Sequence, residues 1–157
     1  MVVQIILGSK SDLEIAKKAA SVLKRLGMEY KVNVASAHRT PEMVERLSNS
    51  DETKVFIAIA GLAAALPGVV AAHTTKPVIG VPVSGKVSLD SILSMVQMPK
   101  GVPVATVGLD SGENAAILAA EILALSDNRI LKSLEKYRRE MRESVGKDDE
   151  ELKQTDV

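Results

Sequence analysis

Residues 2–26 read VVQIILGSKSDLEIAKKAASVLKRL, and this stretch decides the fold class. Residues 2–7 form an almost uninterrupted apolar run, which is typical of a strand buried on both faces of a parallel sheet. Gly8 ends the run, and Ser11 or Asp12 can cap a helix over residues 13–26, which Gly27 closes. The stretch therefore predicts a strand, a polar loop and an amphipathic helix in succession.

The same alternation continues along the chain to residue 125. Strands are predicted at residues 2–7, 31–35, 55–60, 77–83 and 102–107, and helices at residues 13–26, 41–48, 63–72, 88–96 and 113–125. Thr40 followed by Pro41, and Ser88, mark two of the helix starts. Five strands alternating with five helices indicate a doubly wound α/β domain, with helices on both faces of a parallel sheet.

A further helix is predicted from residue 129 to about residue 144, where apolar residues recur at helical spacing: Ile130, Leu131, Leu134, Tyr137 and Met141. We expect this added C-terminal helix to dock on the domain or on another subunit. The polar segment 147–157 is expected to fray. On this basis we expect residues 1–157 to form a single domain with a core at about 2–125.

The composition excludes several classes of function. Twenty Lys and Arg residues balance twenty Asp and Glu residues, so overall charge does not favour nucleic acid or an anionic membrane as a partner. The chain has no Cys, which excludes disulfides, thiolate metal sites and a thiol nucleophile. Two histidines cannot build a multi-histidine metal site within one chain, and three aromatic residues cannot build a stacking platform for bases.

The apolar start of the chain has no basic leader, and Gly8 ends it far short of a membrane span. We therefore expect a protein that is not exported and has no membrane partner. A cytoplasmic location also fits the absence of Cys.

The loop after the first predicted strand, residues 8–12, has the sequence GSKSD and opens a helix. A glycine, two hydroxyl groups and the amides of a helix N-terminus suit a phosphate. Plain helix capping by Ser11 and Asp12 explains the same residues, so the loop alone leaves both interpretations open. It lacks the further glycines of a dinucleotide fingerprint and the Gly-Lys-Ser/Thr of a P-loop, which favours a mononucleotide or a sugar phosphate.

The loop after the second predicted strand, residues 36–41, has the sequence SAHRTP. It places a titratable group, His38, and a fixed cation, Arg39, at the same edge of the sheet as Ser9. A lone histidine is usually a surface or capping residue, but these neighbours favour a functional role. His73 ends the predicted helix 63–72, where an imidazole suits the helix dipole, so we interpret it as structural and expect it at the opposite edge.

The loop after the third predicted strand, residues 60–68, is rich in Ala and Gly. Small residues at a strand-to-helix junction allow close approach by a ligand or by a neighbouring subunit. Tight helix packing would also explain the alanines.

Six motifs, in order, resemble the 5-(carboxyamino)imidazole ribonucleotide mutase family over about residues 2–125. They are GSKSD at 8–12, SAHRTP at 36–41, LPG at 66–68, PVIGVPV at 77–83, VQMP at 96–99 and NAA at 114–116. The resemblance implies a three-layer flavodoxin-like fold, a homo-octamer and a cofactor-free isomerase of de novo purine biosynthesis. In that family a carboxylate moves from the exocyclic nitrogen of 5-carboxyaminoimidazole ribonucleotide to the neighbouring ring carbon, giving 4-carboxy-5-aminoimidazole ribonucleotide.

The resemblance also implies roles for particular residues. Ser9, Asp12 and Arg39 would bind the phosphate and ribose of the ribonucleotide, and His38 would be the general acid and base. The remaining expected substrate contacts are Ser11, Ser36, Gly61, Ala63 and Leu66. No metal and no other cofactor is implied.

One departure keeps a related activity open. Mutases of this family usually carry a histidine at the position of Ala65, and a class of direct aminoimidazole ribonucleotide carboxylases lacks that histidine but typically has Lys at the position of Arg39. Arg39 and the intact Leu-Pro-Gly at 66–68 favour the mutase. A carboxylase of another ring is a further alternative. A receiver-like switch is disfavoured, because Gly8-Ser9 and Ala60-Gly61 stand where its acidic residues would be.

Overall fold

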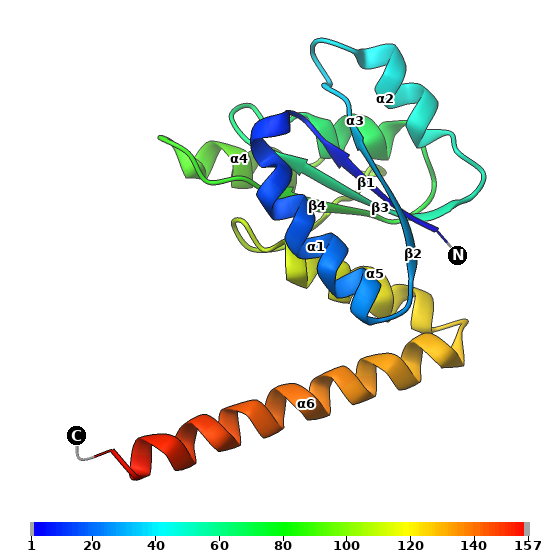
Figure 1. Cartoon of the computed structure of the whole chain (residues 1–157). Helices are drawn as coiled ribbons and strands as arrows, with labels where there is room; N and C mark the ends of the chain where they lie inside the picture. The colour runs from blue at the N-terminus through cyan, green and yellow to red at the C-terminus, as the bar shows by residue number, and fades with distance from the viewer. Residues whose placement is uncertain (1, 156–157) are drawn as a thin grey trace.

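The computed structural model describes residues 2–155, and its centre is a five-stranded parallel sheet in the order β2-β1-β3-β4-β5 (Figure 1). The strands are β1 (Val2–Leu7), β2 (Glu29–Val34), β3 (Thr53–Ala60), β4 (Val78–Pro82) and β5 (Ala105–Thr106). This strand order is that of flavodoxin-like doubly wound sheets. The predicted fold class is therefore confirmed.

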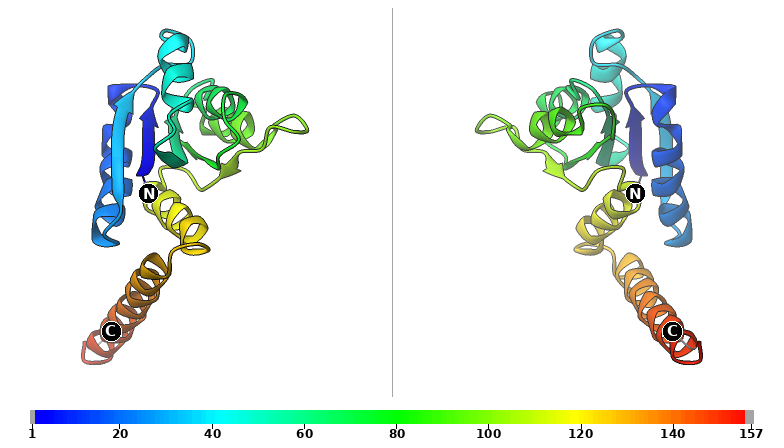
Figure 2. Two further views of the ribbon diagram at one scale, coloured as in Figure 1. Left: turned by 90° about the vertical axis from the view of Figure 1, so that its right-hand side faces the viewer. Right: turned by 90° about the vertical axis from the view of Figure 1, so that its left-hand side faces the viewer.

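Helices cover both faces of the sheet. α1 (Leu13–Arg25) and α5 (Gly112–Ala124) lie on one face, and α2 (Pro41–Ser48), α3 (Leu66–Ala72) and α4 (Ser88–Val96) lie on the other. Figure 2 shows α1 and α2–α4 on opposite sides of the strands. The short 3-10 turn η1 (Lys10–Asp12) leads into α1, and the long helix α6 (Asn128–Lys153) ends the chain.

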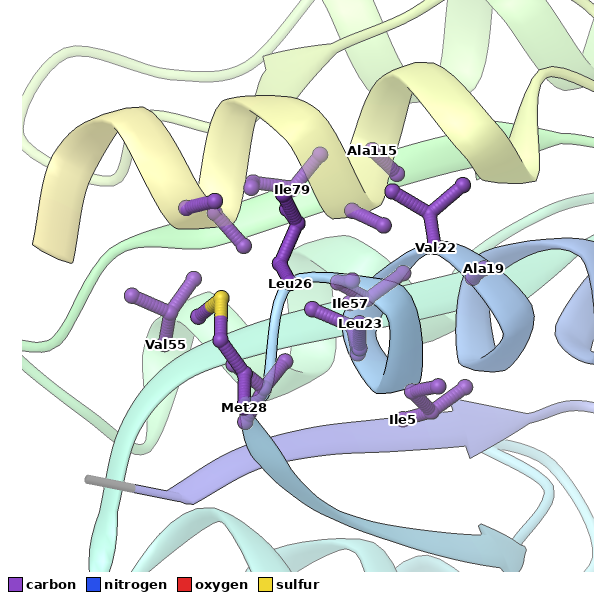
Figure 3. Close-up of a cluster of buried hydrophobic side chains, with 14 of the residues drawn as sticks. Ile5, Ala19, Val22, Leu23, Leu26, Met28, Val55, Ile57, Ile79 and Ala115 are labelled. Carbon is purple, nitrogen blue, oxygen red and sulfur yellow. The ribbon is translucent and has the colours of Figure 1, made fainter. Parts of the chain in front are cut away.

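The larger core lies between the sheet and the α1–α5 layer (Figure 3). Ile5, Ile57 and Ile79 come from three neighbouring strands and are fully buried. Gly112 lets α5 approach α1 closely, because a Cβ there would lie 2.3 Å from the Ile15 carbonyl oxygen. The smaller core on the other face includes Phe56 and is closed by α2, α3 and α4.

Among the elements of the α/β core, β5 and α3 differ from their predicted bounds by more than two residues. β5 contains two residues rather than the six expected at 102–107. α3 begins at Leu66 rather than at residue 63, because residues 61–65 form a tight turn in which the Ala64 N–H donates to the Gly61 carbonyl at 2.9 Å. Leu62 and Ala64 have φ values of 51° and 46°, and this left-handed backbone is incompatible with continuous α-helix.

α6 is longer than the sequence predicts. Its N-cap is Asp127, which accepts a hydrogen bond from the Arg129 N–H at 2.9 Å, and the Arg129 side chain lowers the pKa of Asp127 to about 2. The segment from residue 147, expected to fray, is helical to Lys153, which pairs with Asp149 at 2.6 Å. Its Lys, Glu and Leu residues have high helix propensity, which explains the extension. Within residues 2–155, no helix is long and apolar enough to cross a membrane.

Candidate active site

A cavity of about 480 Å³ opens at the carboxyl ends of β1, β2 and β3. It is lined by residues 8, 9, 11 and 12 after β1, residues 36–39 after β2, and residues 60–66 after β3. All of the residues predicted to form the site lie on its wall: Ser9, Ser11, Asp12, Ser36, His38, Arg39, Gly61, Ala63 and Leu66. Loops that are far apart in the sequence meet here because parallel strands end at the same edge.

The loop after β1 presents one buried carboxylate and two hydroxyl groups. Gly8 continues the sheet, since its N–H donates to the Ile59 carbonyl at 2.9 Å. Ser9 Oγ accepts from the Ser11 N–H at 3.3 Å and so caps η1. Asp12 is only 7% exposed and accepts a hydrogen bond from Ser11 Oγ at 2.9 Å.

Asp12 stands at the N-cap position of α1, but its side chain makes no capping hydrogen bond. Asp12 therefore occupies the predicted position before the helix but does not cap it through its side chain. A carboxylate has about four lone-pair sites, so the single bond from Ser11 leaves acceptor capacity for a hydroxyl-bearing ligand.

The loop after β2 is closed on itself by Ser36 and Thr40. The Ser36 N–H donates to Thr40 Oγ1 at 2.9 Å, and the Thr40 N–H donates to the Ser36 carbonyl at 2.9 Å. His38 lies in the turn between these two residues, on the cavity wall, and its side chain is exposed. The closed turn fixes the backbone that carries the imidazole while leaving the ring accessible to a ligand.

Arg39 connects the first two loops. Its Nη2 donates to the Gly8 carbonyl at 3.1 Å, and its Nε donates to Ser36 Oγ at 3.3 Å. A guanidinium carries five N–H donors, so these bonds hold the group in place and leave donors for an anion. The sequence predicted a cation at this edge but gave no sign of the bond to Gly8.

The third wall, residues 60–66, is apolar and tightly turned. Leu62 is 89% exposed at the rim, whereas Ala64 and Leu66 are buried. The wall residues that were not predicted individually are Gly8, Ala37, Ala60, Leu62, Ala64 and Ala65. Most of them could have been predicted from their positions directly after strand ends. The left-handed backbone conformation of Leu62, however, has no signal in the sequence.

The arrangement has a clear chemical character. α1, through η1, and α2 both begin beside the cavity, so the positive ends of their dipoles face it together with Arg39. Asp12 can accept hydrogen bonds from hydroxyl groups, the serines can accept or donate them, and the His38 imidazole can accept or donate a proton. The cavity can thus hold a phosphorylated, hydroxyl-bearing small molecule beside a proton carrier.

His73 lies away from this cavity. It is the C-cap residue of α3 and lines a separate hollow with Ser48, Asn49, Asp51 and Lys76, at the amino ends of β3 and β4. The expected separation of the two histidines is confirmed. Among residues 2–155, no group of three or more His, Asp or Glu side chains is arranged to hold a metal ion.

Known proteins resemble this chain over almost its whole length. The model of the family described as AIR carboxylase matches residues 2–144. The N5-carboxyaminoimidazole ribonucleotide mutase of Methanocaldococcus jannaschii is 62% identical over 151 residues, with 96% of each chain covered. The protein of the same name from Pyrococcus abyssi is 52% identical, with 89% of this chain and 83% of that one covered. The crystal structure of Treponema denticola PurE superposes with a TM-score of 0.85 at 37% identity, covering 97% of this chain and 98% of that one.

Proposed function

The chain belongs to the AIR carboxylase family, and we propose from this premise that it is the mutase that converts 5-carboxyaminoimidazole ribonucleotide to 4-carboxy-5-aminoimidazole ribonucleotide. It is then an isomerase of de novo purine biosynthesis. The observation that carries the proposal is the convergence of Ser9, Asp12, His38 and Arg39 on one cavity, in a chain whose relatives are named as that mutase.

The first two loops bind the ribonucleotide. Arg39, Ser9 and the amides at the start of η1 hold the phosphate, because a fixed cation and a helix N-terminus both stabilise an anion. Asp12 accepts hydrogen bonds from the ribose hydroxyls, since its buried carboxylate accepts one bond from Ser11 Oγ and has further lone pairs for a ligand. Further substrate contacts come from Ser11, Ser36, Gly61, Ala63 and Leu66.

His38 moves the proton that the reaction needs. As the bond between the exocyclic nitrogen and the carboxylate carbon breaks, the imidazolium protonates that nitrogen and CO2 is released. The neighbouring ring carbon then attacks CO2 to form the new bond, and the neutral imidazole removes the proton from that carbon as the ring regains aromaticity. One proton is given and one is taken, so the isomerisation balances without a redox cofactor or a metal.

The apolar wall at residues 60–66 serves the intermediate. CO2 is small and uncharged, so an enclosure without water keeps it beside the ring carbon better than hydrogen bonds would. Leu62 at the rim and the buried Leu66 supply such surface.

We propose that the protein works as a cytoplasmic homo-octamer of single catalytic domains, with no nucleic-acid or membrane partner. Leu89, Leu93 and Val96 follow one another at helical spacing on α4 and are 61%, 38% and 52% exposed. Such an apolar face supports a contact between subunits. Light scattering at micromolar concentration tests this, and a fully active monomer would contradict it.

A direct carboxylase is the second candidate. The presence of Ala65 favours it, because this residue lies on the cavity wall at a position where mutases of this kind usually carry a histidine. Arg39 favours the mutase. The two activities differ in substrate, since the carboxylase takes aminoimidazole ribonucleotide and CO2.

The experiment that separates them gives purified protein either the carbamate substrate alone or aminoimidazole ribonucleotide with bicarbonate. We expect the carbamate to be converted at low bicarbonate and the second mixture to react far more slowly. A matched His38→Asn protein measures the spontaneous background. If aminoimidazole ribonucleotide with bicarbonate were turned over faster than the carbamate, the protein would be a direct carboxylase and not a mutase.

A further inference from the structure

A threonine just outside the cavity holds the turn that carries His38 and Arg39. Thr40 Oγ1 accepts a hydrogen bond from the Ser36 N–H at 2.9 Å and donates one to the Ser36 carbonyl at 3.3 Å. The Thr40 N–H donates to the same carbonyl at 2.9 Å. Three hydrogen bonds thus join the two ends of the turn 36–40. Residues 36–39 of this turn line the cavity, whereas Thr40 does not.

This use of the Thr40 hydroxyl group is not what its place in the sequence predicts. Thr40 is the N-cap residue of α2, where a threonine side chain usually accepts a hydrogen bond from an amide of the first helical turn. Its side chain makes no such bond. Pro41 follows, and a residue before proline is disfavoured in the α region; Thr40 accordingly has φ −141° and ψ 55°. The side chain of Thr40 thus restrains the loop before α2 instead of capping α2.

Ser36 passes this restraint on to Arg39. Ser36 Oγ accepts hydrogen bonds from the Arg39 N–H and from Arg39 Nε, each at 3.3 Å. Arg39 Nη2 in turn donates to the Gly8 carbonyl at 3.1 Å, in the loop after β1. The Thr40 hydroxyl group is therefore the first member of a series of hydrogen bonds that runs through Ser36 and Arg39 to the other cavity loop. His38 lies inside the turn that this series closes.

We propose that Thr40 is a positioning residue of the active site, which acts through Ser36 on Arg39 and His38 without contacting the ribonucleotide. The side chains of His38 and Arg39 are exposed, so the protein core does not hold them in place. A turn that is already closed lowers the conformational entropy that substrate binding must remove. The kinetic consequences rest on the proposed function, whereas the hydrogen bonds of the turn do not depend on the reaction.

Replacement of Thr40 by Val isolates the hydroxyl group, because valine keeps the shape of the side chain and has neither donor nor acceptor. We expect Thr40→Val to raise KM and to lower kcat, each by about threefold to tenfold, because an open turn displaces both Arg39 and His38. Thr40→Ser keeps the hydroxyl group and should stay within about twofold of the parent protein. The combined change is distinctive, since Arg39→Ala should alter mainly KM and His38→Asn mainly kcat.

Thr74→Val is the matched control. Thr74 Oγ1 also accepts a hydrogen bond from a backbone N–H in a loop, that of Lys76 at 3.3 Å, but at the amino edge of the sheet. Its replacement should leave KM and kcat unchanged. Unfolding curves of both valine variants establish that the assays are made on folded protein. A loss of activity in Thr74→Val equal to that in Thr40→Val would contradict a specific role of Thr40.

A double-mutant cycle tests the path through Arg39. In an Arg39→Ala background, Thr40→Val should no longer raise KM, because the group that it displaces is absent. It should still lower kcat, because His38 remains on the opened turn. A full further increase in KM in this background would show that Thr40 does not act through Arg39 and would overturn the proposed path.

Amide hydrogen exchange, followed by mass spectrometry, tests the closed turn without the reaction. In the absence of substrate, the peptide covering residues 35–41 should exchange faster in Thr40→Val than in the parent protein or in Thr74→Val. Binding of ribose 5-phosphate, a probe that is not turned over, should weaken several-fold in Thr40→Val alone.

Two results would overturn the proposal. One is unchanged exchange in Thr40→Val, and the other is faster exchange with unchanged kinetics and unchanged binding of ribose 5-phosphate. A parent protein without mutase activity, in which exchange and binding still respond to Thr40→Val, would instead contradict the proposed function and leave the role of Thr40 supported.

Discussion

The two edges of the sheet carry similar residues in different surroundings. The carboxyl edge has a cavity of about 480 Å³ with His38 and Arg39, and the amino edge has a hollow of about 420 Å³ with His73 and Lys76. Helices α1 and α2 begin at the first, whereas α2 and α3 end at the second. Helix starts attract anions and helix ends repel them. A histidine beside a cation therefore indicates an anion-binding reaction site only at the edge where helices begin.

The cations at the two edges also have different tasks. Arg39 joins two cavity loops and has donors to spare for a ligand. The Lys76 ammonium donates to the Ser50 carbonyl and so connects the loop before β4 to the loop after α2. Four predictions test whether this contrast between the edges is functional.

The largest effect is expected from the histidines. His38→Asn keeps approximate size and hydrogen-bonding capacity but removes titration, so turnover should fall by about a hundredfold or more. Ribonucleotide binding should survive. The matched His73→Asn variant should keep turnover within a few-fold. Steady-state kinetics on both variants test this prediction. An inactive His73→Asn together with an active His38→Asn would move the predicted reaction site to the amino edge of the sheet.

The cations should show the next largest contrast. Arg39→Ala should raise KM by about tenfold to a hundredfold, the usual range for lost hydrogen bonds to a charged group. The turnover number should change little, because a phosphate contact acts on ground state and transition state alike. Lys76→Ala should leave both parameters unchanged. An Arg39→Ala enzyme with normal KM and reduced turnover would refute a binding role.

The serines should give a smaller contrast. Ser9→Ala removes the cap of η1 and a candidate phosphate donor, so KM should rise a few-fold, in line with a loss of about 1 kcal/mol. Ser48 at the amino edge donates to the Val44 carbonyl at 2.7 Å. Ser48→Ala should lower the free energy of unfolding by about 1 kcal/mol without changing KM. Denaturation curves and kinetics on both variants test these two expectations. A KM for Ser9→Ala equal to that of the parent protein would contradict a role of Ser9 in substrate binding.

No effect is expected from removal of metals. Neither edge has a set of side chains at metal-ligand spacing among the described residues. Treatment with a chelator should therefore leave turnover at the level of an untreated sample. Activity that is lost with the chelator and restored by one specific divalent ion would contradict the proposed proton-transfer mechanism.

The sequence by itself determined the order of strands and helices and the loops that form the cavity. β1, α2 and α4 have the predicted bounds, because hydrophobic periodicity, caps and prolines are local signals. The loops at residues 8–12 and 36–41 could be assigned to one edge because all strand ends of a parallel sheet meet there. The catalytic and binding roles of their residues remain predictions that the variants above test.

Only the tertiary structure decided how those residues are held. The Asp12 carboxylate bonds to Ser11 instead of capping α1, and Arg39 reaches the Gly8 carbonyl 31 residues away. The left-handed turn at Leu62 and Ala64 shortens α3 and shapes the cavity wall. Each of these depends on where neighbouring loops come to rest on the sheet. Contacts between distant segments leave no periodic pattern in the chain. The residues of the site could therefore be predicted from the sequence, whereas their geometry depends on tertiary packing.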